Sequence, residues 1–575
     1  MSNPATPAPS PNRWHTPREG ATNITPVSTP GSATRGSVTP EILASVEGLP
    51  VEGRLPLLKW REAMELARNK TGLPGMSVAV LHKGKLIFAE GFGKRNRNDP
   101  VTAETLMPIA SMTKAMTAAT IGELVAEGKL DWDTTPVSKY VPEAQFGDPI
   151  LTSELTLVDY LSHRSGLPHD DDPWDYSTAT RSDIFKRLKH MKLTSKLGTK
   201  LQYSNIGYAI AGEAAANVAG IPYEKLVEAK VLRPLGLSNT GFSQIEMGKR
   251  PNHGMPHYAD SFQDAQQGRF HEGYPDEDIR LLAPSGGIYS NVLDLVTWGR
   301  TIMHHGELDG EQILNKESVI EQLRARTISR SKRSSPEFAP SSTYGMGWFM
   351  DSYKGQAMYY HGGNLAGYSS NIVLFPDSDL VVAVLSNLFI AMLPNNVPYY
   401  LADEILDLPR TQDWMGDVAV NETIEVYSFI AEGNQGTLPP RIKNKPATHQ
   451  LHQYAGAYFN PLFGNVSVTL ATSEANGVFN KRLHIRFENM LSSMEHYHFD
   501  SFVYIQDMWS MKVRKMLSFT TGKDGKVEGF QIEYLDEVQV FSKEKEEKGS
   551  GGCRGHEEAE EEMLIWKQDS GQYRI

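Results

Sequence analysis

Cysteine is almost absent from this chain of 575 residues. The single cysteine, Cys553, excludes an internal disulfide and a cysteine-rich metal site, and it suits a reducing compartment. The sequence also lacks an uninterrupted apolar run of the ~20 residues that a membrane span requires. Its first twenty residues lack the apolar core of a signal peptide. We therefore expect a cytoplasmic protein that has no membrane partner.

Basic residues are fewer than acidic ones, with 57 Lys and Arg against 69 Asp and Glu. The formal net charge is -12, and no stretch of the chain collects Lys and Arg into a basic stripe. This balance argues against a nucleic acid as the main partner. The apolar share of 40% is ordinary for a globular protein, and the length allows more than one domain with a large core.

The chain divides into four segments by composition and hydrophobic pattern. Residues 1–40 are rich in Pro, Ser and Thr, which predicts disorder. In residues 41–408, strand patterns near both ends flank a helix-rich middle, which predicts an α+β domain with an antiparallel sheet, flanking helices and a helical subdomain. Residues 409–446 are predicted to form a linker. In residues 447–575, short alternating runs predict a small all-β barrel, with a charged, flexible insertion near residues 543–562.

One lysine stands in apolar surroundings. From Ser111 to Gly122, SMTKAMTAATIG, Lys114 is the only charged residue, and the stretch has the composition of a buried helix. Lysine is rarely fully buried without a partner or a function. A spacing of three puts Ser111 and Lys114 on one helix face, and a helix N-terminus favours a developing oxyanion. Because burial lowers the pKa of a lysine, Lys114 could help to accept the proton of Ser111.

The Ser-x-x-Lys pattern alone is weak, since the chain has two further copies. Ser329–Lys332 and Ser542–Lys545 both lie in polar, charge-rich stretches, where a solvated surface is the expected environment. Only Ser111 stands where a helix is predicted to start among apolar residues, so we take it as the candidate nucleophile.

Three motifs follow one another in a characteristic order. They are SMTK at Ser111–Lys114, YSN at Tyr203–Asn205 and HGGN at His361–Asn364. With connecting segments such as LTLVDYLSHRSGLP and YGMGWF, the chain resembles serine β-lactamase-like hydrolases over roughly residues 50 to 405. The similar groups are class C β-lactamases, penicillin-binding esterases and D-amino-acid peptidases of the S12 type. The segment LHQYAGAYFNPLFGNVSV resembles the start of the lipocalin-like domain appended to some of these hydrolases.

The resemblance implies a role for each motif residue. Ser111 would form an acyl-enzyme, and Tyr203 would be the base for acylation and the acid for the leaving group. Tyr203 and Lys114 would share a proton, with coupled titrations. Asn205 would bind Lys114 and the substrate amide. The backbone N–H groups of Ser111 and Asn364 would form the oxyanion hole.

The third motif departs from the Lys-Thr-Gly of many β-lactamases. Histidine is mostly neutral at physiological pH, so His361 would attract an anionic substrate less strongly than a lysine. In the family, histidine or tryptophan at this position accompanies esterases and peptidases. The resemblance therefore favours these activities over a true β-lactamase, with His361, Gly363 and Asn364 lining the substrate and oxyanion site.

Several other residues have structural explanations. YSN recurs at Tyr289, but only Tyr203 leads into a small-residue helix, so Tyr289 is predicted to be a packing residue. His163 in LSHRSGLP is predicted to be a structural loop histidine. The run Asp170–Asp172 lacks the spacing of a Ca²⁺ loop and is predicted to be a solvated loop. Three aromatic residues are assigned equally to the substrate pocket and to the core: Trp174, Tyr344 and Trp348.

These residues imply a serine hydrolase that cleaves an ester or an amide of a small molecule or short peptide, without a metal or an organic cofactor. Acyl transfer with the same nucleophile is an alternative, and a catalytically silent scaffold or binding protein is a second. Intact Ser111, Lys114, Tyr203 and Asn205 argue against the scaffold. The acyl and leaving groups, the stereochemical preference, the pathway, the oligomeric state and the role of the β domain are left open.

Overall fold

The fold is taken from a computed structural model. It describes residues 51–169, 174, 177–275, 279–435, 438–475, 478–508, 511–534 and 537–544. The predictions for residues 1–40, for Asp170–Asp172 and for nearly all of the charged insertion lie outside these residues.

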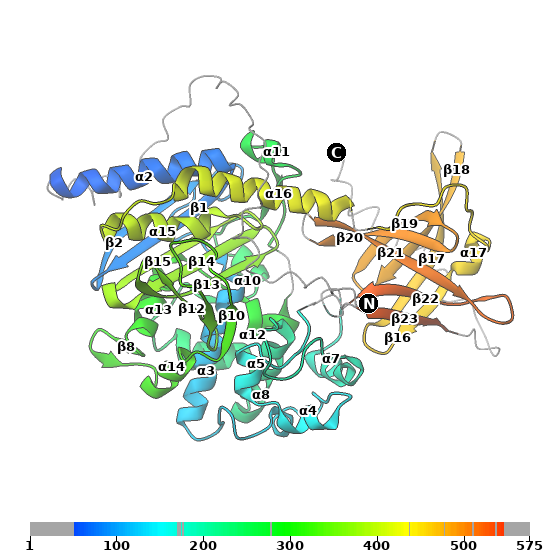
Figure 1. Ribbon diagram of the computed structural model, residues 1–575, viewed down its shortest axis with the longest axis horizontal. Coiled ribbons are helices and arrows are strands. Elements are labelled where there is room, and N and C mark those ends of the chain that lie inside the picture. The colour runs from blue at the N-terminus through cyan, green and yellow to red at the C-terminus, as the bar shows by residue number, and fades with distance from the viewer. Residues whose placement is uncertain are drawn as a thin grey trace.

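An antiparallel sheet of eight strands forms the centre of the first unit (Figure 1). Its order is β10-β11-β12-β13-β14-β15-β1-β2, so the first strand of the unit pairs with the last, β1 with β15. This confirms the predicted antiparallel sheet, built from strands at both ends of the segment. The strands are β1 (Gly75–His82), β2 (Lys85–Gly93), β10 (Thr327–Arg330), β11 (Ser342–Tyr344), β12 (Phe349–Tyr353), β13 (Gln356–Leu365), β14 (Tyr368–Phe375) and β15 (Leu380–Ser386).

Helices cover both faces of this sheet. On one face α13 (Val292–Met303) packs against β1, β14 and β15, and on the other face α15 (Leu393–Ile405) lies beside α2 (Val51–Thr71). Successive side chains of a strand point to opposite faces, so a strand covered on both sides must be apolar throughout. In β15 one set of side chains meets α13 and the alternate set meets the other helical layer: Val381, Ala383 and Leu385 against Leu380, Val382 and Val384.

The predicted helical subdomain lies between β2 and β10 in sequence. Its centre is α8 (Asn205–Ala219), which contacts α3 (Thr113–Ala126), α5 (Leu157–Leu161) and α12 (Ala283–Gly286). Small residues permit this close packing, since a Cβ at Gly212 would lie 2.5 Å from Cγ of Pro284. The remaining α-helices of the described unit are α4 (Pro149–Glu154), α7 (Arg181–Arg187), α9 (Tyr223–Val227), α10 (Gln244–Gly248), α11 (Phe262–Gln266) and α14 (Lys316–Gln322).

The segment 409–446, predicted as a linker, contains a long helix. After a π-helical turn at Trp414–Val418, α16 (Ala419–Gln435) packs on α2 and also contacts β21 (Met511–Thr521) of the second unit. In Figure 1 it runs from above the sheet toward the barrel. Its apolar residues Val426 and Ile430 are buried against Met392. This connection is therefore a packed element between the two units.

The second unit is a closed antiparallel barrel of eight strands, which confirms the predicted all-β domain. It closes where β16 pairs with β23, so closure is complete at Lys543. Aromatic rings such as Tyr458, Phe519 and Phe530 pack inside it, with centroids 4.9–5.9 Å apart. The strands are β16 (Gly456–Asn460), β17 (Gly464–Ala475), β18 (Val478–Phe487), β19 (Met490–His498), β20 (Ser501–Met508), β21 (Met511–Thr521), β22 (Val527–Tyr534) and β23 (Glu537–Lys543).

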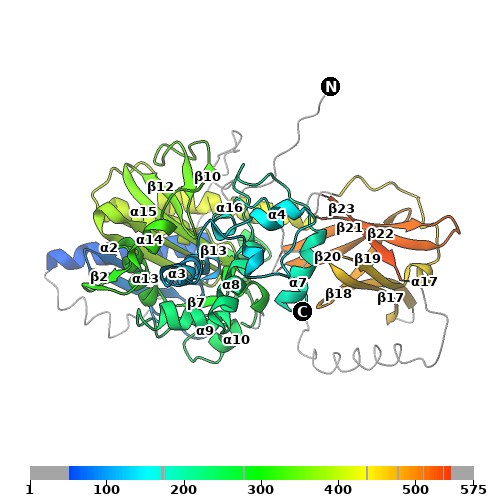
Figure 2. The ribbon, with the colours of Figure 1, turned by 90° about the horizontal axis from the view of Figure 1, so that it is seen from below.

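The barrel contacts the helical subdomain next to α7 (Figure 2). The guanidinium of Arg187 donates to the backbone oxygen of Phe463 at 3.3 Å. Close by, the ammonium of Lys192 forms an ion pair of 3.0 Å with Glu537 of β23. The barrel therefore lies against the helical subdomain, on the side of α7.

Candidate active site

Ser111 lies in a short 3-10 turn, Ala110–Met112, that leads directly into α3 at Thr113. The predicted position at the start of a helix is therefore confirmed. The preceding residue, Ala110, adopts a positive φ of 48°, which a residue with a Cβ rarely does. Such backbone strain persists only where the surroundings hold it, and it is common at functional sites.

Lys114 is fully buried, as the sequence predicts. Its Nζ donates to Ser111 Oγ at 3.1 Å, to Asn205 Oδ1 at 2.7 Å and to the backbone oxygen of Ser285 at 2.8 Å. These three neutral oxygens come from three different segments, namely the turn before α3, the start of α8 and α12. An ammonium has three protons to donate, and this arrangement gives each of them an acceptor.

The YSN motif sits where an extended segment turns into α8. Ser204 is the N-cap residue and Asn205 is the first residue of the helix. The ring of Tyr203 lies 4.7 Å from Lys114 Nζ, and the ring of Tyr208 lies 5.4 Å from it, both within the range of a cation–π interaction. The structure thus brings Ser111, Lys114, Tyr203 and Asn205 into one cluster, as the resemblance implied.

The HGGN motif lies on β13 beside the nucleophile. A Cβ at Gly363 would lie 2.4 Å from the backbone oxygen of Ile109 and 2.8 Å from the backbone nitrogen of Ser111. Only glycine permits so close an approach. Ser370 Oγ of the neighbouring strand also donates to the Ile109 oxygen, at 2.8 Å. The last part of β13 is therefore held against the turn that carries Ser111, and Asn364 is the next residue of this strand.

His361 is buried and neutral. Its Nδ1 faces the backbone oxygen of Gly362 at 2.6 Å, so Nδ1 carries the proton and Nε2 accepts from the hydroxyl of Tyr344 at 3.1 Å. Burial, and then the charge of Lys114, lower the pKa of His361 to about 3. Burial also raises the pKa of Tyr344 well above its usual value, so that hydroxyl keeps its proton. His361 thus contributes shape and polarity at the site, but no positive charge.

His163, predicted to be a structural loop residue, lies in the same cluster. Its ring centroid is 4.1 Å from that of Tyr203, and its Nδ1 accepts from the backbone N–H of Ser204 at 3.1 Å. It is fully buried, and burial followed by the charge of Lys114 lowers its pKa well below the usual value. His163 therefore supports the Tyr203–Ser204 backbone and ring while it remains uncharged.

The other candidates are packing residues. Trp174 and Trp348 are buried in the hydrophobic cores, while Tyr344 is buried and bonded to His361. Tyr289 lies on the short strand β7 (Ile288–Ser290), where its ring covers Gly241, in keeping with its predicted packing role. Ser329 Oγ pairs with Ser342 Oγ at 2.7 Å on the edge strands. Within the described ranges, no group of three or more His, Cys, Asp or Glu side chains could hold a metal ion, and no described helix is both long and apolar enough to cross a membrane.

Four features together define a serine β-lactamase-like hydrolase fold. They are a serine at a helix start, a buried lysine one turn further on, a tyrosine ring beside that lysine, and a glycine of a β-strand packed against the serine. The family model described as Beta-lactamase matches residues 60–405. The chain belongs to this family of hydrolases. A second family model, Domain of unknown function (DUF3471), matches residues 440–548, which include the whole barrel.

Two curated relatives are similar over long segments. The "Unguisins hydrolase ungD'" of Aspergillus campestris is 24% identical over 434 residues, which are 71% of this chain and 76% of the relative. The "Protein flp" of Staphylococcus aureus is 27% identical over 337 residues, which are 58% of this chain and 63% of the relative. The match thus spans less than two thirds of the staphylococcal protein.

Two solved structures share the fold. An octameric penicillin-binding protein homologue from Pyrococcus abyssi aligns with a TM-score of 0.52 at 19% identity, and the alignment covers 84% of this chain and 99% of the homologue. EstCE1, a hydrolase with promiscuous acyltransferase activity, aligns with a TM-score of 0.52 at 18% identity, covering 62% of this chain and 100% of EstCE1.

The neutral state of His361 makes stability depend on pH. Because its pKa is near the ordinary 6.5 when unfolded and about 3 when folded, the unfolded chain binds the extra proton between these values. Stability is therefore lost as the pH falls below about 6.5, by up to ~1.4 kcal/mol per pH unit from this residue. The free energy of unfolding, measured with urea at several pH values from 7 to about 4.5, should fall less steeply with pH in His361→Gln, by that amount per pH unit.

The exposed His452→Gln serves as the control and should keep the slope of the wild-type chain. An unchanged slope in His361→Gln would show that His361 is charged or accessible in the folded protein.

Proposed function

We propose that this chain is a serine hydrolase that cleaves an ester or an amide through an acyl-enzyme on Ser111. The observation that carries the proposal is the buried Lys114 ammonium, which donates at 3.1 Å to Ser111 Oγ and lies 4.7 Å from the ring of Tyr203. A buried cation that touches a serine hydroxyl lowers the free energy of the alkoxide that forms as the hydroxyl loses its proton.

The proposed first step is acylation. The proton of Ser111 passes to Tyr203, whose phenolate is stabilised by the Lys114 charge, and Oγ attacks the carbonyl carbon. The carbonyl oxygen becomes an oxyanion, which we expect the backbone N–H groups of Ser111 and Asn364 to hold. Removal of one such donor usually costs about 3–4 kcal/mol of transition-state stabilisation. Collapse of the intermediate breaks the ester or amide bond, and Tyr203 returns its proton to the leaving alcohol or amine.

Deacylation uses the same groups. Water takes the place of the leaving group, gives a proton to Tyr203 and attacks the acyl carbon, after which Ser111 recovers its hydrogen and the acid departs. An alcohol or an amine in place of water would give acyl transfer instead. Product analysis with an added alcohol distinguishes these two outcomes.

The site favours substrates that do not need a positive charge at the third motif. His361 is neutral and its Nε2 is engaged by Tyr344, so it offers no charge to a carboxylate of the kind that β-lactams carry. Small esters, D-amino-acid amides and short peptides of the kind that S12-type peptidases cleave fit this environment better. The name of the Aspergillus relative, a hydrolase of unguisins, supports the hydrolytic assignment. The absence of a cofactor and the cytoplasmic location stay predictions.

A fluorophosphonate probe tests the nucleophile. We expect one covalent adduct, mapped to Ser111 by peptide mass spectrometry, which Ser111→Ala abolishes. Lys114→Met should slow labelling about 100-fold, because removal of a positioned proton-transfer partner typically costs a factor of 10²–10⁴.

The matched control is Ser329→Ala, which removes the serine of another Ser-x-x-Lys copy and should label as the wild type does. Unfolding temperatures of all variants separate a loss of reactivity from a loss of folding. A wild-type chain that is folded but forms no adduct would favour the silent scaffold.

The two YSN copies give a second test. Tyr203→Phe keeps the ring that packs on His163 and removes only the hydroxyl, so we expect ester hydrolysis to fall by a factor of 10²–10⁴ with little change in stability. Tyr289→Phe makes the same change at the packing copy and should retain near-wild-type kcat. Equal losses in the two variants, measured by steady-state kinetics, would contradict the role proposed for Tyr203.

A further inference from the structure

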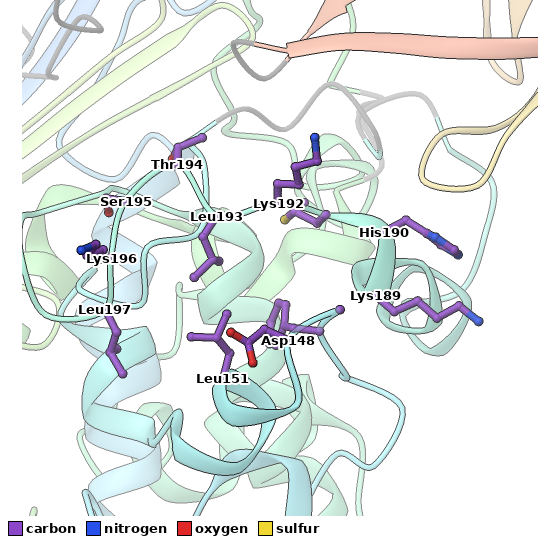
Figure 3. A pocket seen from close by; sticks show the side chains of 13 residues that line it. Asp148, Leu151, Lys189, His190, Lys192, Leu193, Thr194, Ser195, Lys196 and Leu197 are labelled. Atoms are coloured by element: carbon purple, nitrogen blue, oxygen red, sulfur yellow. The ribbon is translucent and has the colours of Figure 1, made fainter.

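A cavity of about 780 Å³ lies outside the candidate active site, in the helical subdomain near the barrel (Figure 3). Two segments line it: residues 146–151, around the start of α4, and residues 189–197, which follow α7. Leu151, Leu193 and Leu197 come together in its interior, and the long side chains of Lys189 and Lys192 extend away from them (Figure 3). The interior is apolar, and its volume suits a segment of several side chains.

The rim of this cavity is basic. The exposed side chains of Lys189, Lys192 and Lys196 line it, together with His190. The acid of the lining, Asp148, caps α4, since its carboxylate accepts from the N–H of Ile150 at 2.9 Å. An occupant that combines carboxylates with apolar side chains would therefore complement both the rim and the interior.

This chain carries a segment of that chemistry. Residues 557–566 read EEAEEEMLIW, with five glutamates among the first six residues and four apolar residues directly after them. The segment lies outside the described residues, beyond β23. Its acidic part matches the basic rim, and its apolar part, Met563–Trp566, matches the leucine-lined interior.

The position of β23 puts this segment within reach. Its first residue, Glu537, already pairs with Lys192 at the rim, at 3.0 Å. From Glu537 to Lys543 the strand spans roughly 20 Å, at about 3.3 Å per residue. Twelve residues lie between Glu544 and Glu557, and this connection can span up to ~45 Å when extended. The chain can therefore return from the far end of β23 to the cavity without strain.

We propose that residues 557–566 dock in this cavity of their own chain, with glutamates at the lysine rim and Met563–Trp566 among the leucines. This internal contact would fasten the end of the barrel domain to the helical subdomain. It uses none of the groups proposed for catalysis, so it stands or falls independently of the proposed function.

The single cysteine makes the test direct, because Cys553 lies four residues before Glu557. We would label it in the full-length chain with a benzophenone maleimide, irradiate the monomer and map the cross-links by mass spectrometry. Cross-links should fall on residues 146–151 and 189–197. The triple variant Lys189→Glu, Lys192→Glu, Lys196→Glu should lose most of them, by a factor of ten or more.

The matched control reverses three exposed lysines elsewhere, Lys85→Glu, Lys225→Glu and Lys249→Glu, with the same change in net charge. It should keep the wild-type cross-links. Cross-links that scatter over the surface, or that survive reversal of the rim, would overturn the proposal. In an equal mixture of ¹⁴N and ¹⁵N chains, cross-links that join light to heavy chains would assign the cavity to a second copy and would overturn docking within one chain.

A peptide of residues 555–568 provides a second measurement. A chain ending at Glu544 retains every described strand of the barrel and leaves the cavity free. This shorter chain should bind the labelled peptide, measured by fluorescence anisotropy, at least tenfold more tightly than the full-length chain, whose own segment competes. Equal binding to both chains, or none to the shorter one, would refute the docking. Tight binding of a fatty acid carboxylate to the full-length chain, if the triple rim variant loses it, would show a free cavity and have the same consequence.

Discussion

The buried ammonium of Lys114 is the interaction on which the rest of the site depends. A charge removed from water must be met by hydrogen bonds, because an isolated buried ion is several kcal/mol unfavourable. Here the compensation comes from Ser111, Asn205 and the backbone of Ser285. Since these groups belong to three separate elements, satisfying one charge fixes the relative positions of α3, α8 and α12. The hydrogen bonds that the buried charge needs are therefore the same contacts that set the geometry of the site.

The same charge determines the state of its neighbours. His163 and His361 are buried near Lys114, and burial together with that charge lowers both of their pKa values. Each histidine then acts through hydrogen bonds and ring packing, His163 toward Ser204 and Tyr203, and His361 toward Tyr344. A family member with a lysine at position 361 would place a second cation close to the first. This chain has a neutral ring there, so position 361 adds no second positive charge beside Lys114.

Much of this arrangement can be predicted from the sequence, and the rest cannot for identifiable reasons. Lys114 is conspicuous because it is a charge in an apolar helix, and Tyr203 and Asn205 belong to a recognisable motif. The Ser285 oxygen is a backbone group, so no residue type reveals it. His163 reaches Tyr203 through a positive φ of 56°, which its loop sequence does not indicate. Helix α16 was hidden in a segment whose Gly and Pro content suggested a linker, although Val426 and Ile430 lie one helical turn apart.

The most direct test of the account is to trap the acyl-enzyme itself. The chain would be mixed with an activated p-nitrophenyl ester of a short acid, quenched in acid within its first turnovers and digested for peptide mapping by mass spectrometry. The account predicts an acyl group on Ser111 that appears together with the first equivalent of p-nitrophenol and then decays by hydrolysis. Steady release of p-nitrophenol with Ser111 unmodified at every quench time, or with the acyl group on another residue, would contradict it.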